Sequence, residues 1–324
     1  MKFGSVPVEI AQGAVLAHTL TLGAATFRKG SVVTGDAVAA MRAQGVTEVI
    51  VARLDPADVP ENIAAARLAA ALAGDGLDVR EAFTGRANLH AAGPGVVGLN
   101  VAAIDAVNAV DPMITVATLP QWQRVAGGTM AATVKIIAYA VDSAALDRAC
   151  AAGRGAMRLH PPALRDADLI VTHLGSGGPV KVGPVIDRLA RLGVETKVSN
   201  VAHDVDALSE ALTRATAPLR LILTASATSD VADVGPSALA GAGGTLTRFG
   251  MPVDPGNLLF LGEMAGATVI GLPGCARSPA LNGADWVLER IVCGVPVSEA
   301  DIAAMGVGGL LKEIPTRPQP RERR

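Results

Sequence analysis

The stretch ADLIVTHLGSGGPVKVGPVIDRLARLGVETKVSNVAHD, residues 167–204, decides the fold class of this chain. Its first eight residues form an apolar, β-branched run of the kind that builds buried strands. Residues 182–193 then show helical apolar spacing and end at a glycine, and residues 195–202 return to a strand pattern. Because strand, helix and strand in succession are typical of a βαβ unit, we expect parallel strands covered by helices.

The same alternation continues towards the C-terminus. Asp204 stands at the N-cap position of the next predicted helix, which supports a helix start there. The predicted elements are a helix over 204–215, a strand over 219–226, a helix over 233–243, a hairpin-like pair over 245–253 and 258–264, a strand over 267–272 and a helix that begins near residue 279. We therefore predict an α/β domain with a mainly parallel sheet covered on both faces.

The first half of the chain is less regular. It predicts helices over 34–45 and 60–74 and strands over 46–54, 114–120 and 132–141. A chain of 324 residues suggests two domains. We expect the division within residues 151–167, where Gly, Pro and charged residues interrupt the periodicity. The predicted parts are a mixed α+β region over 1–160, an α/β domain over 161–311 and a flexible, Pro-rich tail over 312–324.

The composition argues against several classes of protein. A formal net charge of −2 gives no sign of a nucleic-acid surface or of attraction to an anionic membrane. Three widely spaced cysteines show neither a disulfide framework nor a zinc signature, which favours a reducing compartment. The first 20 residues lack the apolar core of a signal peptide, and no uninterrupted apolar run is long enough to span a membrane. We expect a cytoplasmic chain.

Two short patterns carry little weight. GPGVVG at 93–98 matches the dinucleotide fingerprint G-x-G-x-x-G, but the preceding FTGRANLHAA does not read as a buried strand. No acidic residue follows at the expected strand end either, so a chance match among 36 glycines is the better interpretation. The five histidines show no ligand spacing on any predicted helix, so the pattern does not support a metal site.

Polar or small residues follow four of the predicted strands. The runs are THLGSGG (172–178), VAHD (201–204), TASATSDVAD (224–233) and GLPGCARS (271–278). In an open parallel sheet, ligands bind outside the carboxyl ends of the strands. A loop rich in hydroxyls before a helix is suited to a phosphate group, and glycines allow close approach of the backbone. The pattern therefore predicts a site for a phosphate-bearing ligand.

Each of these residues also has a simpler interpretation. Asp233 or Ser229 caps the helix predicted after residue 233, a role that leaves the neighbouring hydroxyls unexplained. Cys275 lies at the mouth of a predicted helix, whose dipole would lower its pKa. No base is evident beside it, so a small loop residue is the better interpretation of Cys275 than a nucleophile.

Three runs resemble a known family. LTASATSDVADVGPSAL (223–239), FGMPVDPGNLLFLG (249–262) and VIGLPGCARSPALNGADWVLERI (269–291) follow the order and spacing of the molybdopterin-binding fold. That three-layer α/β/α fold is shared by molybdopterin adenylyltransferase and molybdopterin molybdotransferase. FRKGSVVTGDAVAAMRAQGVTEVIVARL (27–54) resembles the molybdotransferase segment that precedes this domain. The whole chain resembles the leading portion of bacterial fusions that end in a molybdenum cofactor cytidylyltransferase.

The resemblance implies a ligand and a set of site residues. The ligand is molybdopterin or the molybdenum cofactor, held in a protein that is usually oligomeric, here a homo-oligomer. Asp233 and Asp204 are then the candidate catalytic carboxylates, with Asp233 as a ligand of Mg²⁺, since that ion prefers hard oxygen donors. The implied cofactor-binding residues are Thr224, Ser226, Thr228, Ser229, Asp230, Gly271, Pro273, Gly274, Arg277 and Ser278.

The chain also departs from the family pattern. The loop T-G-G-T-G becomes Thr224-Ala225-Ser226-Ala227-Thr228, the acidic strand end becomes Thr172-His173-Leu174-Gly175, and the lysine-bearing run becomes Asp254-Pro255-Gly256-Asn257-Leu258. Lysines would balance the charge of molybdate and phosphate, whereas Asp254 repels them. Three functions stay open: a pterin-binding module that serves a cytidylyltransferase partner, an active molybdate or nucleotidyl transferase, and a structural or regulatory module that has lost its ligand.

Overall fold

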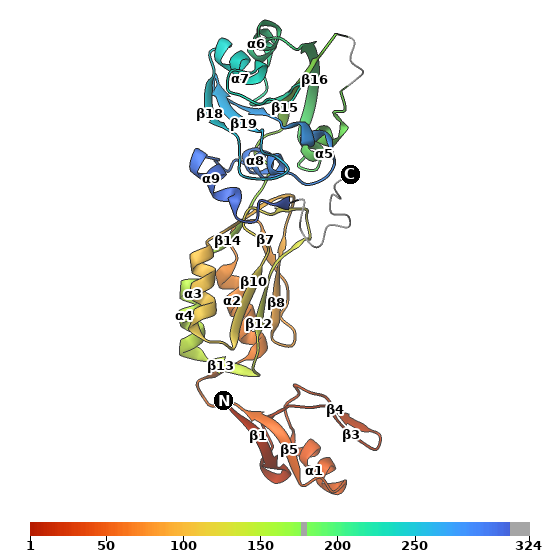
Figure 1. Ribbon diagram of the computed structural model, residues 1–324. Coiled ribbons are helices and arrows are strands. Elements are labelled where there is room, and N and C mark those ends of the chain that lie inside the picture. The colour runs from red at the N-terminus through yellow and green to blue at the C-terminus, as the bar shows by residue number, and fades with distance from the viewer. Residues whose placement is uncertain (176–179, 312–324) are drawn as a thin grey trace. The chain divides into compact units, whose positions relative to one another are not determined.

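The computed structural model describes residues 1–175 and 180–311 (Figure 1). The chain forms two compact units, one of residues 1–93 and 97–159 and the other of residues 94–96 with those from 160 onwards. The predicted flexible tail at 312–324 lies outside the described residues. Within the described ranges, no helix is long and apolar enough to cross a membrane.

Residues 1–53 of the first unit build a small core of their own. Strand β1 (Lys2–Pro7) and β2 (Val15–Leu16) both pair antiparallel with β5 (Glu48–Arg53), and β3 (Leu20–Leu22) pairs with β4 (Ala25–Phe27). Helix α1 (Gly35–Ala43) begins after Thr34, whose hydroxyl accepts the Ala37 N–H. A short 3₁₀ helix, η1 (Val8–Ile10), also contributes to the buried cluster, which includes Val8, Met41 and Val51.

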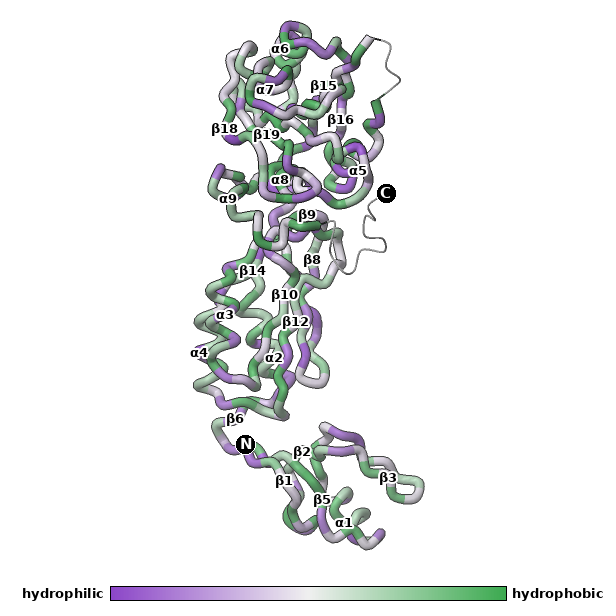
Figure 2. Tube along the Cα trace, viewed as in Figure 1, coloured by the Kyte–Doolittle hydropathy of each residue, from purple (hydrophilic) through white to green (hydrophobic). Residues whose placement is uncertain are grey.

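The rest of the first unit is an antiparallel sheet covered by three helices. The sheet has the order β10–β12–β8–β7, and helices α2, α3 and α4 bury their apolar faces against it and one another. Figure 2 shows mainly hydrophobic residues along α3 and α4, interrupted by a few hydrophilic ones. The bounds are β6 (Asp58–Pro60), α2 (Glu61–Leu72), β7 (Leu77–Val79), β8 (Arg86–Ala91), β9 (Gly95–Leu99), α3 (Val101–Val110), β10 (Ile114–Thr118), β11 (Arg124–Val125), β12 (Met130–Ile136), β13 (Ala140–Asp142), α4 (Ser143–Ala152) and β14 (Met157–His160).

Two expectations for this unit were wrong or incomplete, and the interpretation of GPGVVG as a chance match is confirmed. Helices α3 and α4 were missed, although Asn100 and Asp142 cap them, because their Ala- and Val-rich sequences show no clean amphipathic period. Residues 86–91 were not expected to form a buried strand, yet in β8 every second side chain is buried. The GPGVVG match runs into strand β9, so its glycines do not form a phosphate-binding turn at a helix start.

The second unit is organised around one six-stranded sheet with the order β16–β15–β17–β20–β19–β18. The strands β15 (Asp166–His173), β16 (Glu195–Ala202), β17 (Leu219–Leu223) and β20 (Ala267–Gly271) pair in parallel. The pair β18 (Thr245–Phe249) and β19 (Phe260–Met264) extends the sheet antiparallel to β20. The mixed α/β class predicted from the sequence is thereby confirmed.

Helices lie on both sides of this sheet. Figure 1 shows α6 (Val205–Arg214) and α7 (Val234–Gly241) on one side and α5 (Gly183–Ala190) and α8 (Gly283–Val292) on the other. Helices α6 and α7 pack on a buried cluster that includes Ile170, Ile222 and Phe260. The chain then forms α9 (Glu299–Ala303) and the 3₁₀ turn η3 (Ala304–Gly306).

The helix expected from about residue 279 begins at Gly283. A capping box sets this start, because the Asn282 side chain accepts from the first helical turn and Asp285 accepts the Asn282 N–H. Residues before it form the 3₁₀ turn η2 (Gly274–Arg277). The GLPGCARS run is therefore a structured loop between β20 and α8.

A buried arginine holds this loop in place. Arg188 on α5 is 8% exposed, and its Nε–H donates to Asp285 on α8. Its Nη1 donates to the carbonyls of Pro184 and Ala276, each at 2.9 Å. Its Nη2 donates to the carbonyls of Ser278 at 2.8 Å and Ala280 at 2.9 Å. All five N–H groups of the guanidinium are used, so Arg188 fixes the path of the loop from Ala276 to Ala280.

The loop also depends on a glycine that meets an aromatic ring. Phe260 is 1% exposed, and a Cβ on Gly271 would overlap its ring, while one on Gly235 would lie 2.9 Å from its Cε1 atom. Gly274, three residues further on, is exposed and has open space where a Cβ would stand. Packing against Phe260 alone requires a glycine at residue 271. The predicted approach of a ligand to the backbone is therefore not needed to explain Gly271.

Replacing Arg188 by methionine should destabilise the protein by about 3–5 kcal/mol, because Asp285 is left buried without its partner. Urea unfolding followed by circular dichroism measures this change. The control is Arg214→Met, which removes an exposed i,i+4 pair with Glu210 and should cost no more than about 0.5 kcal/mol. Equal effects of the two substitutions would contradict the structural role given to Arg188.

Gly271→Ala should destabilise the second unit by about 1–3 kcal/mol, because the added methyl group displaces the Phe260 ring. Gly274→Ala is the matched control, and it should be neutral or slightly stabilising because nothing lies within contact distance. Thermal unfolding of both variants against the wild type compares them directly. A tolerated alanine at residue 271 would mean that the ring does not pack as described.

Candidate functional site

The strand order places a topological switch point at the carboxyl edge of the second sheet. The chain runs from β15 through α5 to β16 and returns through α6 to β17, and these two helices lie on opposite sides of the sheet (Figure 1). Strands β16 and β17 therefore flank β15. The connection that leaves β15 through α5 and the one that leaves β17 through α7 lie on opposite sides of the sheet. Such a switch point is where open α/β sheets bind ligands.

The four polar runs predicted from the sequence meet at this edge. The parallel register aligns His173 with Ala202, Val171 with Leu223 and Ile222 with Gly271. The loops after β15, β16, β17 and β20 thus leave the sheet on the same side. Of the run 172–178, residues 172–175 are described and the remainder lies outside the described residues.

A chain of hydrogen bonds joins three of these strand ends. The buried Thr172 Oγ1 accepts the Ala225 N–H at 2.8 Å and lies 2.8 Å from His203 Nδ1. His203 Nε2 in turn lies 2.8 Å from Ser226 Oγ. Ser226 is exposed, and His203 is partly buried. The network therefore links a buried hydroxyl, that of Thr172, through His203 to an exposed hydroxyl, that of Ser226.

Two of the predicted phosphate donors turn inwards. Thr224 and Thr228 are buried, and the Thr224 hydroxyl donates to the Ser226 carbonyl at 2.7 Å. The two threonine Oγ1 atoms lie 3.2 Å apart, so the Thr228 hydroxyl donates to that of Thr224. Both hydroxyl hydrogens are used within the loop. Ser226 and Ser229 are the exposed hydroxyls of this run.

The two candidate catalytic carboxylates serve as helix caps. Asp204 accepts the Ala207 N–H at 2.9 Å, and Asp233 accepts the N–H groups of Val234 at 2.8 Å and Ser229 at 3.0 Å. Asp230 accepts the Ala232 N–H. Throughout residues 1–175 and 180–311, no group of three or more His, Cys, Asp or Glu side chains is placed to hold a metal ion. The predicted Mg²⁺ site at Asp233 has no support in this geometry.

The second loop is tied to the first. Arg277, predicted to pair with phosphate, donates through Nη2 to the Thr224 carbonyl, which joins the loop after β20 to the loop after β17. Ser278 is exposed, and its hydroxyl oxygen accepts the Ala280 N–H at 3.2 Å. Pro273 is buried, whereas Gly274 is exposed. Arg277 therefore joins the two loops, and Gly274 and Ser278 present their surfaces outwards.

Cys275 has the properties of a structural residue. It lies in the 3₁₀ turn η2 and precedes the start of α8 by several residues, so the expected effect of a helix dipole does not apply. Burial raises the pKa of its thiol. Burial also raises the pKa of Cys293, to about 11. A raised pKa keeps the thiol protonated, which argues against a nucleophile and favours the small loop residue.

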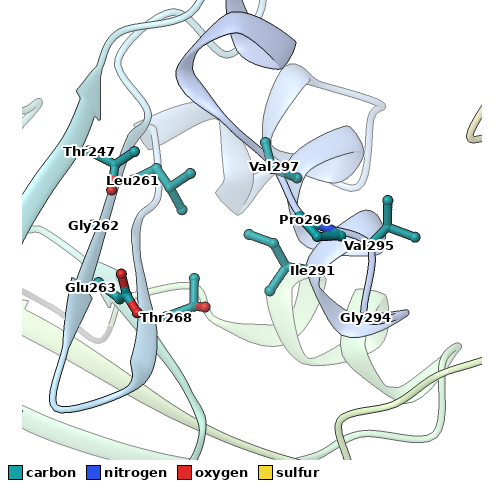
Figure 3. Close-up of a pocket in the computed structure, with 10 residues that line it drawn as sticks. All are labelled: Thr247, Leu261, Gly262, Glu263, Thr268, Ile291, Gly294, Val295, Pro296 and Val297. Carbon is teal, nitrogen blue, oxygen red and sulfur yellow. The ribbon is translucent and has the colours of Figure 1, made fainter.

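Two cavities of the second unit lie away from the strand-end loops. One, of about 240 Å³, lies between strands β18 to β20 on one side and the end of α8 with the segment that follows it on the other, with Leu261 and Thr268 facing Ile291 (Figure 3). The other, of about 380 Å³, lies at the amino ends of the parallel strands, where Asp168 accepts the N–H groups of Thr216 and Ala217. Neither includes a residue of the four polar runs.

The sequence predicts that the four polar runs follow strands but does not indicate the hydrogen bonds that link them. His203 and Thr172 each lie in one of the four runs, yet nothing in the sequence indicates that the two side chains touch Ser226 or each other. The signal in the sequence is indirect. A threonine and a histidine stand at the ends of two successive predicted strands, and the sequence does not give the order of those strands in the sheet.

Comparisons of sequence give little identification. The family model described as "Domain of unknown function (DUF8806)" matches residues 5–53, the segment that forms its own buried cluster in the first unit. No curated protein matches the chain.

Solved structures give a looser likeness. One is described as the crystal structure of a molybdopterin biosynthesis MoeA protein from Pyrococcus horikosii, with 12% identity and a TM-score of 0.32 over 90% of this chain and 75% of that one. Another is a molybdenum cofactor biosynthesis protein from Pyrococcus furiosus, with 12% identity and a TM-score of 0.26 over 91% of this chain and 66% of that one. Scores at this level do not establish a shared overall fold.

Proposed function

We propose that this chain binds molybdopterin or the molybdenum cofactor through its phosphate group and serves the biosynthesis of that cofactor. The carrying observation is the convergence of four polar strand-end loops at the switch point between β15 and β17. The sequence resemblance over residues 223–291 supports the identity of the ligand. The proposal includes the three-layer α/β/α arrangement of the molybdopterin-binding fold for the second unit.

The helix starts at this edge differ in their suitability for an anion. Helices α6 and α7 begin at Asp204 and Asp233, whose carboxylates already occupy N–H groups of the first turn and repel a phosphate. Helix α5 begins after Val182 with no side-chain cap, and the exposed Lys181 directly precedes that residue. We place the phosphate nearest the start of α5, at the same edge of the sheet as the exposed hydroxyl of Ser226.

Binding is a better proposal than transfer. The lysine that the family resemblance implies for molybdate chemistry is replaced here by Asp254, and Arg277 is engaged with the Thr224 carbonyl. A carrier needs only to hold the pterin phosphate and release it to a partner, for which a cytidylyltransferase is our proposal. We further propose a cytoplasmic homo-oligomer. Turnover of molybdopterin with a nucleoside triphosphate or molybdate would favour an active transferase instead.

The decisive first measurement uses protein purified from a host that makes the cofactor. Oxidation of the sample converts a bound pterin to a fluorescent product, which is quantified against the protein. The proposal predicts a stoichiometric signal. If a demonstrably folded protein releases no pterin, the result favours the structural or regulatory alternative. A lack of stabilisation by added ligand would support the same alternative, because a ligand that binds the native state must raise its apparent stability by mass action.

Asp233→Asn separates a metal ligand from a helix cap. Asparagine caps a helix about as well as aspartate, so the fold should be preserved. Since the substitution removes a negative charge at the anion-binding edge, pterin retention should be unchanged or increased, with or without added Mg²⁺. Asp204→Asn is the matched variant on α6 and should behave alike. A loss of binding confined to Asp233→Asn in the presence of Mg²⁺ would restore the metal role.

Gly274→Val tests whether the ligand approaches the second loop. The residue is exposed with open space around it, so valine should leave the fold intact but block the backbone from the ligand. We expect the affinity for the pterin to fall about tenfold, equivalent to about 1.4 kcal/mol. Cys275→Ser is the control, expected to bind normally. Unchanged binding by Gly274→Val would remove this loop from the site, and a large effect at Cys275 would revive the nucleophile.

A further inference from the structure

The hydrogens of the strand-end network can be counted. Thr172 Oγ1 is fully buried and accepts the Ala225 N–H at 2.8 Å, a bond whose direction is fixed because the amide can only donate. The hydroxyl has one hydrogen, and within the described residues its remaining partner is His203 Nδ1 at 2.8 Å. A buried hydroxyl hydrogen without an acceptor is costly, which favours Thr172 as the donor and His203 Nδ1 as the acceptor, and in the neutral ring the proton then resides on Nε2.

This tautomer sets the direction of the last bond. Nε2–H of His203 donates to Ser226 Oγ at 2.8 Å, so the serine oxygen accepts. A nucleophilic serine needs the reverse arrangement, in which the hydroxyl donates to an unprotonated Nε2. Although the three side chains resemble a catalytic triad in their spacing, the hydrogen count excludes His203 in this state as the base that activates Ser226.

The arrangement instead leaves the Ser226 hydrogen available. Ser226 is exposed, and its hydroxyl has no second hydrogen-bond partner in the described part of the chain. Since the oxygen is held by His203, the hydrogen points away from the ring. Nearby Asp204 is turned to its helix cap, where it accepts the Ala207 N–H. The hydroxyl is thus a donor with a fixed orientation at the switch point.

We propose that His203 is a positioning residue, oriented by Thr172, which fixes the Ser226 hydroxyl as an outward donor to a phosphate oxygen. The inference rests on the proposed function and names the phosphate group as the part of the ligand that this edge of the sheet binds. The unprotonated oxygens of a phosphate group only accept hydrogen bonds, so a donor held in advance suits them. A donor that needs no reorientation also binds at a lower entropic cost.

The tautomer can be measured without any ligand. Nitrogen-15 NMR of the histidine side chains distinguishes Nε2–H from Nδ1–H rings, and the spectrum of His203→Gln identifies the signal of His203 among the five histidines. We expect the Nε2–H form in the wild type, a changed signal in Thr172→Val and restoration in Thr172→Ser. An Nδ1–H ring in the folded wild type would overturn the proposal.

Binding is tested with inorganic phosphate, by calorimetry on the whole chain. Ser226→Ala and His203→Asn should each weaken binding about tenfold, since each loses one oriented hydrogen bond. His203→Gln should bind within about twofold of the wild type, because the glutamine amide places an N–H close to the position of Nε2. His18→Asn, the same change at an exposed histidine of the first unit, is the matched control and should bind normally.

A double variant tests the coupling. Ser226→Ala combined with His203→Asn should be no weaker than either single variant, because the two residues provide one donor between them. Additive losses, or equal losses in His203→Asn and His203→Gln, would overturn the role of His203. If the wild type binds phosphate and all variants bind equally, this inference alone fails. If the wild type binds neither phosphate nor pterin, the proposed function fails with it.

Discussion

The ion pair between Arg188 and Asp285 is the interaction on which the second unit's candidate site depends. Burying a cation is costly unless every donor finds an acceptor, and here one carboxylate and four carbonyls supply them. Three of those carbonyls belong to residues 276–280, so satisfying the arginine fixes the loop. Asp285 also accepts the Asn282 N–H, and the same carboxylate thereby sets the start of α8. A loop rich in glycine and proline acquires one conformation through a single side chain.

The residues at the strand ends divide into two groups: those whose polar atoms are hydrogen-bonded within the protein, and those that are exposed. Thr224, Thr228, Arg277 and the helix-capping aspartates are occupied in joining loops to each other and to helix starts. Ser226, Gly274 and Ser278 are exposed. The first group makes this edge of the sheet rigid, and the second forms its accessible surface. Under the proposed function, the hydrogen-bonded residues would contribute to binding without touching the ligand, because rigidity lowers the entropic cost of binding.

Much of the second unit was predictable because its elements are locally determined. The runs at 167–174 and 219–226 are mainly apolar, the run at 195–202 contains several β-branched residues, and Asp204 marks a helix start, so strand and helix follow from short-range rules. Helices α3 and α4 were missed because their many alanines carry no clear period, and only the sheet they cover reveals which face is buried. The predicted start of α8, near residue 279, is too early, because the capping box formed by Asn282 and Asp285 begins the helix at Gly283.

By itself, the sequence determined the α/β class, the alternation of strands and helices, and the four polar runs that follow strands. Tertiary structure alone decided which of those residues meet. Thr172, His203 and Ser226 belong to three different strand ends, and their contacts exist because the sheet order places β15 between β16 and β17. Likewise Arg188 contacts residues about ninety positions away. Local patterns record the conformation of a segment, whereas hydrogen-bond partners depend on how distant segments pack, which no short-range rule encodes.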